Sequence, residues 1–307
     1  MAMNVKTNKI ILPISISIIT LALLGGIFYF ASKAPWIKAP ESSTSEEIED
    51  SNVRGFDYSW TTNPYIAHAF GGILGDTYTN SYEAFLLNYQ LGHRVFEVDF
   101  FITNDGKTVL AHDDGHWQTN ATLQADGYVP IDTSKPSEFT YDNFMSSLWY
   151  GKYHPVNLEE LFKLMQNYPD IYIVTDTKYT DKQHVQDQFS AFLESAKNID
   201  STLLDRFIVQ IYHPQMLDWV MEVYPWRSII YTLYANPNWT TENVIEFSQS
   251  SGVKFITIPS TSLTPDNISS WAAQGIKIAV HTINNYAEAQ RFHGLGVSNI
   301  YTDFLIP

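Results

Sequence analysis

From residue 56 onward the sequence alternates short β-rich segments with amphipathic helical stretches, and this alternation limits the folds that the chain can adopt. Several of the helical stretches end at Gly or before Pro, as helices commonly do. The strand pattern occurs in eight segments: 65–70, 94–101, 171–177, 206–212, 227–234, 253–259, 276–283 and 299–305. Eight β/α units in about 250 residues predict an α/β protein with a (β/α)8 TIM barrel rather than an open doubly wound sheet.

One connection between the predicted strands is much longer than the others. Residues 104–156 separate the second strand from the third, and this length exceeds that of an ordinary loop. We interpret the segment as an insertion at the active site. Most aromatic residues of the chain are expected to pack in the core, but Trp117 and Trp149 could form a wall there for a headgroup or sugar.

The N-terminal segment has a different character from the rest of the chain. Residues 10–31 are 22 residues without a charge, long enough to cross a hydrocarbon core of about 30 Å as a helix. The run exceeds the apolar part of a cleaved signal peptide, about 7 to 15 residues, so we favour an uncleaved anchor over a signal peptide. We therefore predict a cytoplasmic tail and transmembrane anchor in residues 1–38, with a single-pass protein in the cell membrane and an extracytoplasmic catalytic domain.

Charge and composition divide the remaining chain and exclude several classes of function. Residues 39–55 form an acidic, Ser-rich linker, and residues 56–307 form the folded domain. The net charge is −15, and all 33 acidic residues lie at or beyond Glu41, so nucleic acid is not an expected partner. The chain has no cysteine, which excludes disulfides, thiolate metal sites and cysteine nucleophiles.

Polar side chains gather at the ends of the first three predicted strands, where (β/α)8 barrels carry their chemistry. His68 ends the first strand, and the second ends with a pair of acids. Alternation places Glu97 and Asp99 on one face, and Asp176 and Lys178 also share a face. Three inward carboxylates would repel one another unless a cation lay between them. Because carboxylate oxygens suit hard cations, the sequence predicts one site for Mg²⁺ or Ca²⁺.

The same acids allow a structural interpretation without a metal. Glu97 and Asp99 could face solvent, or they could pair with Arg94 and Lys178. The apolar residues that alternate with the two acids are also expected to be buried, against helices on the other face, and this favours the metal site.

Histidines and a tyrosine at other predicted strand ends add candidates for the site. Imidazole titrates near pH 6.5, so His68 and His112 could act as a general acid and base. Either histidine alone would more commonly be a core or surface residue. Tyr212 and His281, at the ends of the fourth and seventh strands, could also reach the pocket and contact substrate.

In their order along the chain, these residues resemble the glycerophosphodiester phosphodiesterases of the phosphatidylinositol-specific phospholipase C-like superfamily. The resemblance spans nearly the whole barrel and is carried by AHAFGG (67–72), YTNSYEAF (78–85), FEVDF (96–100), TNDG (103–106), AHDD (111–114), VTDTK (174–178) and GVSNIYTDFLIP (296–307).

The resemblance implies a metal-dependent phosphodiester hydrolase of lipid metabolism, acting on glycerophosphodiesters, phospholipid headgroups or a glycerol-phosphate polymer. It implies a general acid/base pair in His68 and His112. The implied metal ligands are Glu97, Asp99 and Asp176, with Asp176 in place of a glutamate. Lys178 would contact the phosphate, and Asn80 would shape the metal and phosphate site.

Besides Asp176, this sequence departs from the family pattern at three further positions, and two other functions stay open. Ala69 replaces an arginine that would neutralise the phosphate, His281 replaces a tryptophan, and Thr79 replaces a glutamate. Lys107, Arg94 or a residue of 114–156 could supply the missing charge. One alternative is a metal-independent lyase like phosphatidylinositol-specific phospholipase C. The other is a non-catalytic barrel that binds a phosphate-containing ligand.

Overall fold

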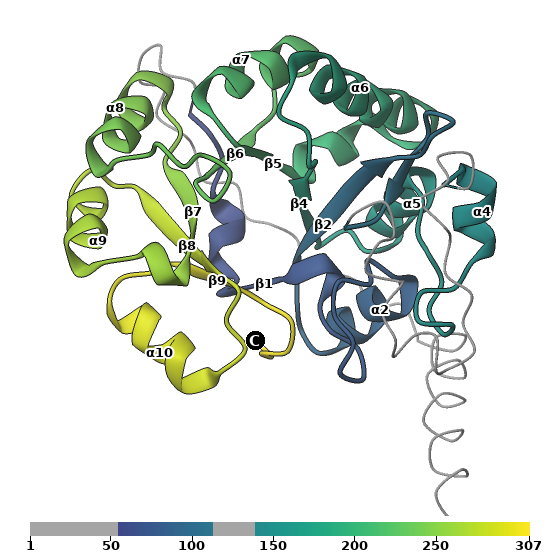
Figure 1. Ribbon diagram of the computed structural model, residues 1–307, viewed down its shortest axis with the longest axis horizontal. Helices are drawn as coiled ribbons and strands as arrows, with labels where there is room; N and C mark the ends of the chain where they lie inside the picture. Colours follow the sequence, from purple (N-terminus) through teal and green to yellow (C-terminus); the bar gives the residue numbers. More distant parts are fainter. Residues whose placement is uncertain (1–54, 113–138) are drawn as a thin grey trace, which may run out of the picture. The chain divides into compact units, whose positions relative to one another are not determined.

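The computed structural model describes residues 55–112 and 139–307, and this part of the chain contains the predicted barrel (Figure 1). Eight parallel strands follow the order β1-β9-β8-β7-β6-β5-β4-β2, and pairing of β1 with β2 closes the sheet. The strands are β1 (Tyr65–Ala67), β2 (Val95–Ile102), β4 (Tyr172–Asp176), β5 (Phe207–Ile211), β6 (Ser228–Thr232), β7 (Phe255–Pro259), β8 (Lys277–His281) and β9 (Asn299–Thr302). All eight predicted strands are confirmed.

Helices surround the barrel and cover the outer face of the sheet (Figure 1). They are α2 (Tyr82–Gln90), α4 (Tyr141–Ser146), α5 (Leu158–Asn167), α6 (Lys182–Ile199), α7 (Pro214–Val223), α8 (Thr241–Ser251), α9 (Pro265–Ala272) and α10 (Tyr286–Gly294). Their N-termini follow local sequence signals, because Asn157 and Thr264 each form a capping box and Pro214 occupies the first turn of α7.

The long connection begins with a feature that the sequence did not predict. Strand β3 (Thr108–Leu110) turns back and pairs antiparallel with the end of β2. Only three residues form this strand, too few to give a recognisable alternation. The structure also describes α4 at the other end of the connection, whereas residues 113–138, including Trp117, lie outside the described part of the chain.

The inside of the barrel is built in two layers, because inward-facing positions recur every second residue along each strand. The lower layer is an apolar cluster that includes Ile66, Val95, Val174, Ile208, Ile230, Phe255 and Ala279. Two residues further along the same strands, the inward positions are polar: His68, Glu97, Asp176, Gln210, Thr232, Thr257 and His281. The apolar layer fills one end of the barrel, and the polar layer faces its carboxyl end.

The membrane anchor stays a prediction. Among the helices of residues 55–112 and 139–307, none has the length and apolar character needed to cross a bilayer. The predicted span at 10–31 and the predicted linker at 39–55 lie outside the described residues, apart from residue 55.

Candidate active site

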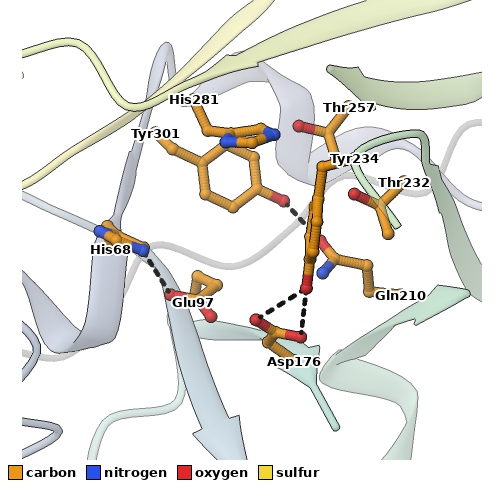
Figure 2. Close-up of a pocket in the computed structure, with 9 residues that line it drawn as sticks. All are labelled: His68, Glu97, Asp176, Gln210, Thr232, Tyr234, Thr257, His281 and Tyr301. Carbon is orange, nitrogen blue, oxygen red and sulfur yellow. Dashed lines mark hydrogen bonds and ion pairs between the residues drawn. The ribbon is translucent and has the colours of Figure 1, made fainter. Parts of the chain in front are cut away.

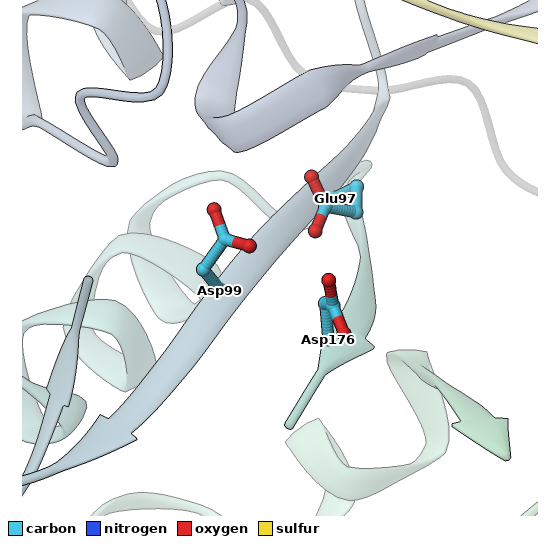
Figure 3. A group of neighbouring side chains, drawn as sticks. All are labelled: Glu97, Asp99 and Asp176. Carbon is cyan, nitrogen blue, oxygen red and sulfur yellow. The ribbon is translucent and has the colours of Figure 1, made fainter. Parts of the chain in front are cut away.

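Three carboxylates from adjacent strands meet at the carboxyl end of the barrel (Figure 3). Glu97 and Asp99 come from β2, and Asp176 is the last residue of β4. Each offers an oxygen atom, and these atoms lie within 4.8 Å of one another. The side chains are buried, with exposed fractions of 2%, 0% and 7% in that order. The interpretation that Glu97 and Asp99 face solvent is therefore wrong.

Lys178 provides positive charge inside this acidic cluster. Its Nζ atom lies 2.7 Å from Asp99 Oδ1 and 2.5 Å from Asp176 Oδ2. Of the pairings in the interpretation without a metal, the one between Asp99 and Lys178 is present, but neither Glu97 nor Asp99 pairs with Arg94. Arg94 instead donates to Asp170 Oδ2 over 2.6 Å. Among the described lysines and arginines, Lys178 forms ion pairs with two of the three carboxylates, Asp99 and Asp176.

Hydrogen bonds from neighbouring residues fix the carboxylates in place. Asn80 Nδ2 donates to Asp99 Oδ2 over 2.8 Å, and the Asp99 amide donates back to Asn80 Oδ1 over 3.0 Å. The backbone amide of Ala69 donates to Glu97 Oε2 over 2.8 Å. Tyr212 donates its hydroxyl to Asp176 Oδ1. Asn80 and Tyr212, both predicted as site residues, therefore lie against the acidic cluster.

Burial and mutual repulsion make this cluster a suitable place for a cation. Burial raises the pKa of Glu97, and the charges of Asp99 and Asp176 raise it further. For Asp99, burial opposes ionisation, but the charges of Lys178, His112 and His68 and the hydrogen bond from Asn80 together outweigh burial and lower the pKa. The one positive charge of Lys178 does not neutralise the negative charges of three carboxylates. Hard oxygen ligands from Glu97, Asp99 and Asp176 therefore fit one Mg²⁺ or Ca²⁺ ion.

His68 lies beside the carboxylates and is held by a fourth acid. Its Nδ1 atom is 2.9 Å from Asp303 Oδ1, and its Nε2 atom is 3.9 Å from Glu97 Oε2. Burial lowers the pKa of His68, but the hydrogen bond with Asp303 and the charges of Glu97, Asp303 and Asp99 outweigh burial and raise it to about 9. Asp303 is itself oriented by Asn284, whose Nδ2 donates to Asp303 Oδ2 over 2.7 Å.

His112, the second predicted histidine, lies near His68, and one tyrosine contacts both rings. The ring of Tyr78 makes edge contacts with both imidazoles, at centroid distances of 4.8 Å to His68 and 4.7 Å to His112. The charge of His112 also favours ionised Asp99. The two histidines, which are far apart in the first half of the sequence, thus lie near the same carboxylates.

A cavity opens above the polar layer of the barrel (Figure 2). It contains about 280 Å³ of space not filled by protein atoms, part of it open to solvent, and is lined by His68, Glu97, Asp176, Gln210, Thr232, Tyr234, Thr257, His281 and Tyr301. His281 was predicted to reach this pocket and does. Burial and the charge of His68 lower its pKa to about 4, so its imidazole is neutral at neutral pH.

Several residues of the site were not predicted from the sequence, and the signals that could have indicated them differ. Asp303 lies inside the segment GVSNIYTDFLIP, which carried the resemblance, yet no role was assigned to it. Gln210, Thr232 and Thr257 each follow an inward apolar residue by two positions, a signal that alternation could have provided. Tyr234 lies in a loop after β6, and no local pattern indicates that its hydroxyl approaches Asp176 at 3.3 Å.

Two other predicted residues do not contribute to the described site. Trp149 is buried in the core and packs its ring edge-on against Phe144 at 5.4 Å, so it does not form a wall of the pocket. Trp117 lies outside the described residues. At the position of the missing arginine, Ala69 contributes only its backbone amide.

Comparison with known proteins agrees with the fold. The model of the glycerophosphoryl diester phosphodiesterase family matches residues 54–306, which is most of the chain. A search of curated proteins found no significant match.

Solved structures with the same fold come from several bacteria. A glycerophosphodiester phosphodiesterase from Parabacteroides distasonis is 16% identical, with a TM-score of 0.61 and coverage of 78% of this chain and 92% of that one. An Oleispira antarctica phosphodiesterase in complex with its product sn-glycerol-3-phosphate is 19% identical, with a TM-score of 0.60 and coverage of 78% and 93%. A Thermotoga maritima glycerophosphodiester phosphodiesterase is 20% identical, with a TM-score of 0.56 and coverage of 83% and 96%. At these identities the likeness shows the fold.

Proposed function

Because the chain belongs to the glycerophosphoryl diester phosphodiesterase family and is a phosphoric diester hydrolase, we propose that it hydrolyses glycerophosphodiesters or related glycerol-phosphate substrates with a divalent cation. The observation that carries this proposal is the buried cluster of Glu97, Asp99 and Asp176 beside the His68–Asp303 hydrogen bond. The solved complex of the Oleispira antarctica enzyme with sn-glycerol-3-phosphate supports a small phosphodiester as the substrate class.

The three carboxylates would hold the cation, which when bound supplies positive charge that polarises a phosphoryl oxygen. Lys178 adds a second positive charge in the same place, because its ammonium already contacts two of the carboxylates. It is the described residue best placed to offset the loss of the family arginine at Ala69. A phosphate oxygen in this cluster would replace carboxylate contacts of the Lys178 ammonium.

The two histidines would manage the protons of the reaction. Asp303 holds Nδ1 of His68, and this leaves Nε2 directed toward Glu97 and the cavity. His112 lies on the other side of Tyr78. One histidine takes a proton from the attacking oxygen and the other gives a proton to the leaving alcohol. The attacking oxygen belongs to water or to a neighbouring hydroxyl of the substrate, which would first form a cyclic phosphate.

The geometry favours hydrolysis over the two alternatives. A metal-independent lyase would need an arginine in place of the cation, whereas the described site contains three buried carboxylates and Lys178. A non-catalytic barrel would have no use for a histidine whose orientation is fixed by a buried acid. The His68–Asp303 pair therefore argues for proton transfer.

We also propose that residues 10–31 anchor the protein in the cell membrane and that the barrel lies outside the cytoplasm. The support is the uncharged run of 22 residues, which matches the thickness of a bilayer core. Extraction of membranes with alkaline carbonate tests the anchor, and protease digestion of intact cells tests the side on which the barrel lies. Release of the full chain by carbonate, or its protection in intact cells, would contradict these proposals.

The activity is tested with the full chain purified in detergent and a panel of glycerophosphodiesters. Release of sn-glycerol 3-phosphate is measured with Mg²⁺, with Ca²⁺ and with EDTA. We expect turnover that requires the cation and is lost in Glu97→Gln and in His68→Asn. Matched controls are Glu159→Gln and His184→Asn, which change exposed residues of α5 and α6. Turnover that is unaffected by EDTA would refute the metal-dependent mechanism.

A further inference from the structure

The side chain of Tyr78 links the two histidines of the proposed acid/base pair. Tyr78 lies in the connection between β1 and α2, and its ring centroid is 4.8 Å from that of His68 and 4.7 Å from that of His112. The interplanar angles are 79° and 68°, so both contacts are edge contacts. One rigid ring therefore touches the imidazole that follows β1 and the imidazole that follows β3.

The backbone of Tyr78 has a conformation that tyrosine rarely adopts. Its φ is +58°, in the left-handed region that favours glycine, asparagine and aspartate. Residues on both sides of it are held by the site and its surroundings. Tyr150 donates its hydroxyl to the carbonyl oxygen of Thr77 over 3.3 Å, and Asn80 donates to Asp99 over 2.8 Å. Strained residues persist where the surrounding structure fixes them, and they cluster at functional sites. The backbone of Tyr78 thus indicates a role in the site.

The phenol of Tyr78 adds no charge to the acidic cluster. Burial raises its pKa, and the charges of Asp303, Asp99 and Glu97 raise it further. Together these effects outweigh the opposing charge of Lys178, so the hydroxyl stays protonated at neutral pH. The contacts with the two histidines are made by the ring, and the ring is therefore the part of the side chain to which we assign a role.

Hydrolysis of a phosphodiester places a geometric demand on an acid and a base that act together. The attacking and leaving oxygens lie roughly in line, on opposite sides of the phosphorus. The group that takes one proton and the group that gives the other must therefore stand apart. Asp303 holds His68 from behind through Nδ1. A ring that contacts both imidazoles limits how closely they can approach each other and how far His112 can turn.

We propose that Tyr78 is a positioning residue that sets the separation and orientation of His68 and His112 for the two proton transfers. The inference rests on the proposed function, because it takes the two histidines as the acid and the base. It goes beyond that function by assigning a role to a residue that acts through the histidines. Loss of the ring therefore slows the chemical step and leaves substrate binding unchanged.

Steady-state kinetics of the full chain in detergent test this role with the best substrate of the glycerophosphodiester panel. Tyr78→Leu removes the ring and should lower kcat about 10- to 100-fold, the effect of misplaced catalytic groups, while KM changes less than about twofold. Tyr78→Phe keeps the ring and should keep kcat within about twofold of the wild type. Tyr78→Gly removes the ring but relieves the positive φ, so it should lose kcat without losing thermal stability. This variant carries the test if Tyr78→Leu does not fold.

Tyr82→Leu is the matched control. Tyr82 is the first residue of α2 and is 41% exposed, against 37% for Tyr78, and the ring contacts of His68 and His112 given above do not include it. We expect this variant to keep both kcat and KM. An equal loss of kcat in Tyr78→Phe and Tyr78→Leu would overturn the proposal, because the hydroxyl would then be the active group. Unchanged kcat in Tyr78→Leu would also overturn it, whether or not KM rises, since a rise in KM alone reports substrate binding.

Failure of the positioning role and failure of the proposed function give different results. If the wild type hydrolyses a diester of the panel and the Tyr78 variants match it, only the positioning role is refuted. If the wild type hydrolyses none, the proposed function fails, and the positioning role is tested by the reaction of histidines with diethyl pyrocarbonate, located by mass spectrometry. Faster modification of His112 in Tyr78→Leu than in Tyr78→Phe would then support the positioning role, and equal rates would overturn it.

Discussion

His68 and Asp303, which stand 235 positions apart in the sequence, form a hydrogen bond of 2.9 Å between Nδ1 and Oδ1 at the point where the barrel closes. His68 directly follows β1, and Asp303 directly follows β9, the strand that pairs with β1. The closure of the barrel thus places an acid behind the proposed catalytic histidine. This arrangement orients the imidazole and stabilises its protonated form.

This pairing predicts the effect of Asp303→Asn. An asparagine keeps the shape of the side chain but removes the charge, and its amide would present a donor to Nδ1 and favour the wrong tautomer. We expect kcat to fall about 10²- to 10⁴-fold with little change in KM. Steady-state kinetics measure this, and circular dichroism checks that the variant is folded. Asp266→Asn, on the exposed first turn of α9, is the control. A variant with unchanged kcat would exclude a role for Asp303 in orienting His68.

The acidic cluster predicts that a divalent cation stabilises the protein. A ligand that binds only the folded state adds about 2.7 kcal/mol at a concentration of 100 Kd. Thermal unfolding of the full chain should therefore shift upward with Mg²⁺ or Ca²⁺, and the shift should be lost in Asp99→Asn. The control is Asp170→Asn, which removes an exposed partner of Arg94. Equal shifts of the unfolding temperature in Asp99→Asn and Asp170→Asn would show that the cation binds at another site.

Tyr212 should tune the affinity for the cation without binding it. Its hydroxyl donates to Asp176 Oδ1, so Tyr212→Phe frees that carboxylate and weakens cation binding, by about 10- to 100-fold for a typical partner of a metal ligand. Calorimetric titration measures this affinity. Tyr231→Phe is matched in size and burial, but its hydroxyl accepts from Asn236 instead. Equal affinity of Tyr212→Phe and Tyr231→Phe for the cation would exclude this role of Tyr212.

His93 predicts a loss of stability in mild acid that does not depend on the active site. Burial lowers the pKa of His93 to about 4, while its Nε2 lies 2.9 Å from the carbonyl oxygen of Leu305. Between about pH 6.5 and 4 the unfolded chain binds a proton that the folded protein does not, so stability falls as the pH is lowered through this window. The full effect is about 3 kcal/mol.

Urea unfolding at several pH values measures this contribution. His93→Gln keeps a donor for Leu305 but does not titrate, so the variant should lose stability less steeply than the wild type between pH 6.5 and 4. His154→Gln removes an exposed histidine that pairs with Glu83 and serves as the control. If stability depends on pH in the same way in the wild type and in His93→Gln, His93 does not cause the loss of stability in mild acid.

The active-site acids show how much of the site the sequence predicts. Alternation placed Glu97 and Asp99 together on one face of a strand, and the ends of neighbouring parallel strands placed Asp176 and Lys178 beside them. Both relations depend only on local periodicity and on the order of the strands. The environment of Asp303 depends instead on which strand closes the barrel, and Tyr234 reaches Asp176 from a loop. Alternation with Tyr301 places Asp303 on the inner face but does not show that it contacts His68, and Tyr234 carries no periodic signal of its own.

The sequence by itself determined the number of barrel strands, their boundaries to within a few residues, and the acids that share a face of the barrel. Each of these follows from side-chain alternation, which is a property of a single strand. Only the tertiary structure decided that Lys178 lies between the carboxylates, that Asp303 supports His68, and that the ring of Tyr78 contacts both histidines. These relations arise when eight strands close into a barrel, because closure brings side chains from distant parts of the chain into one buried space.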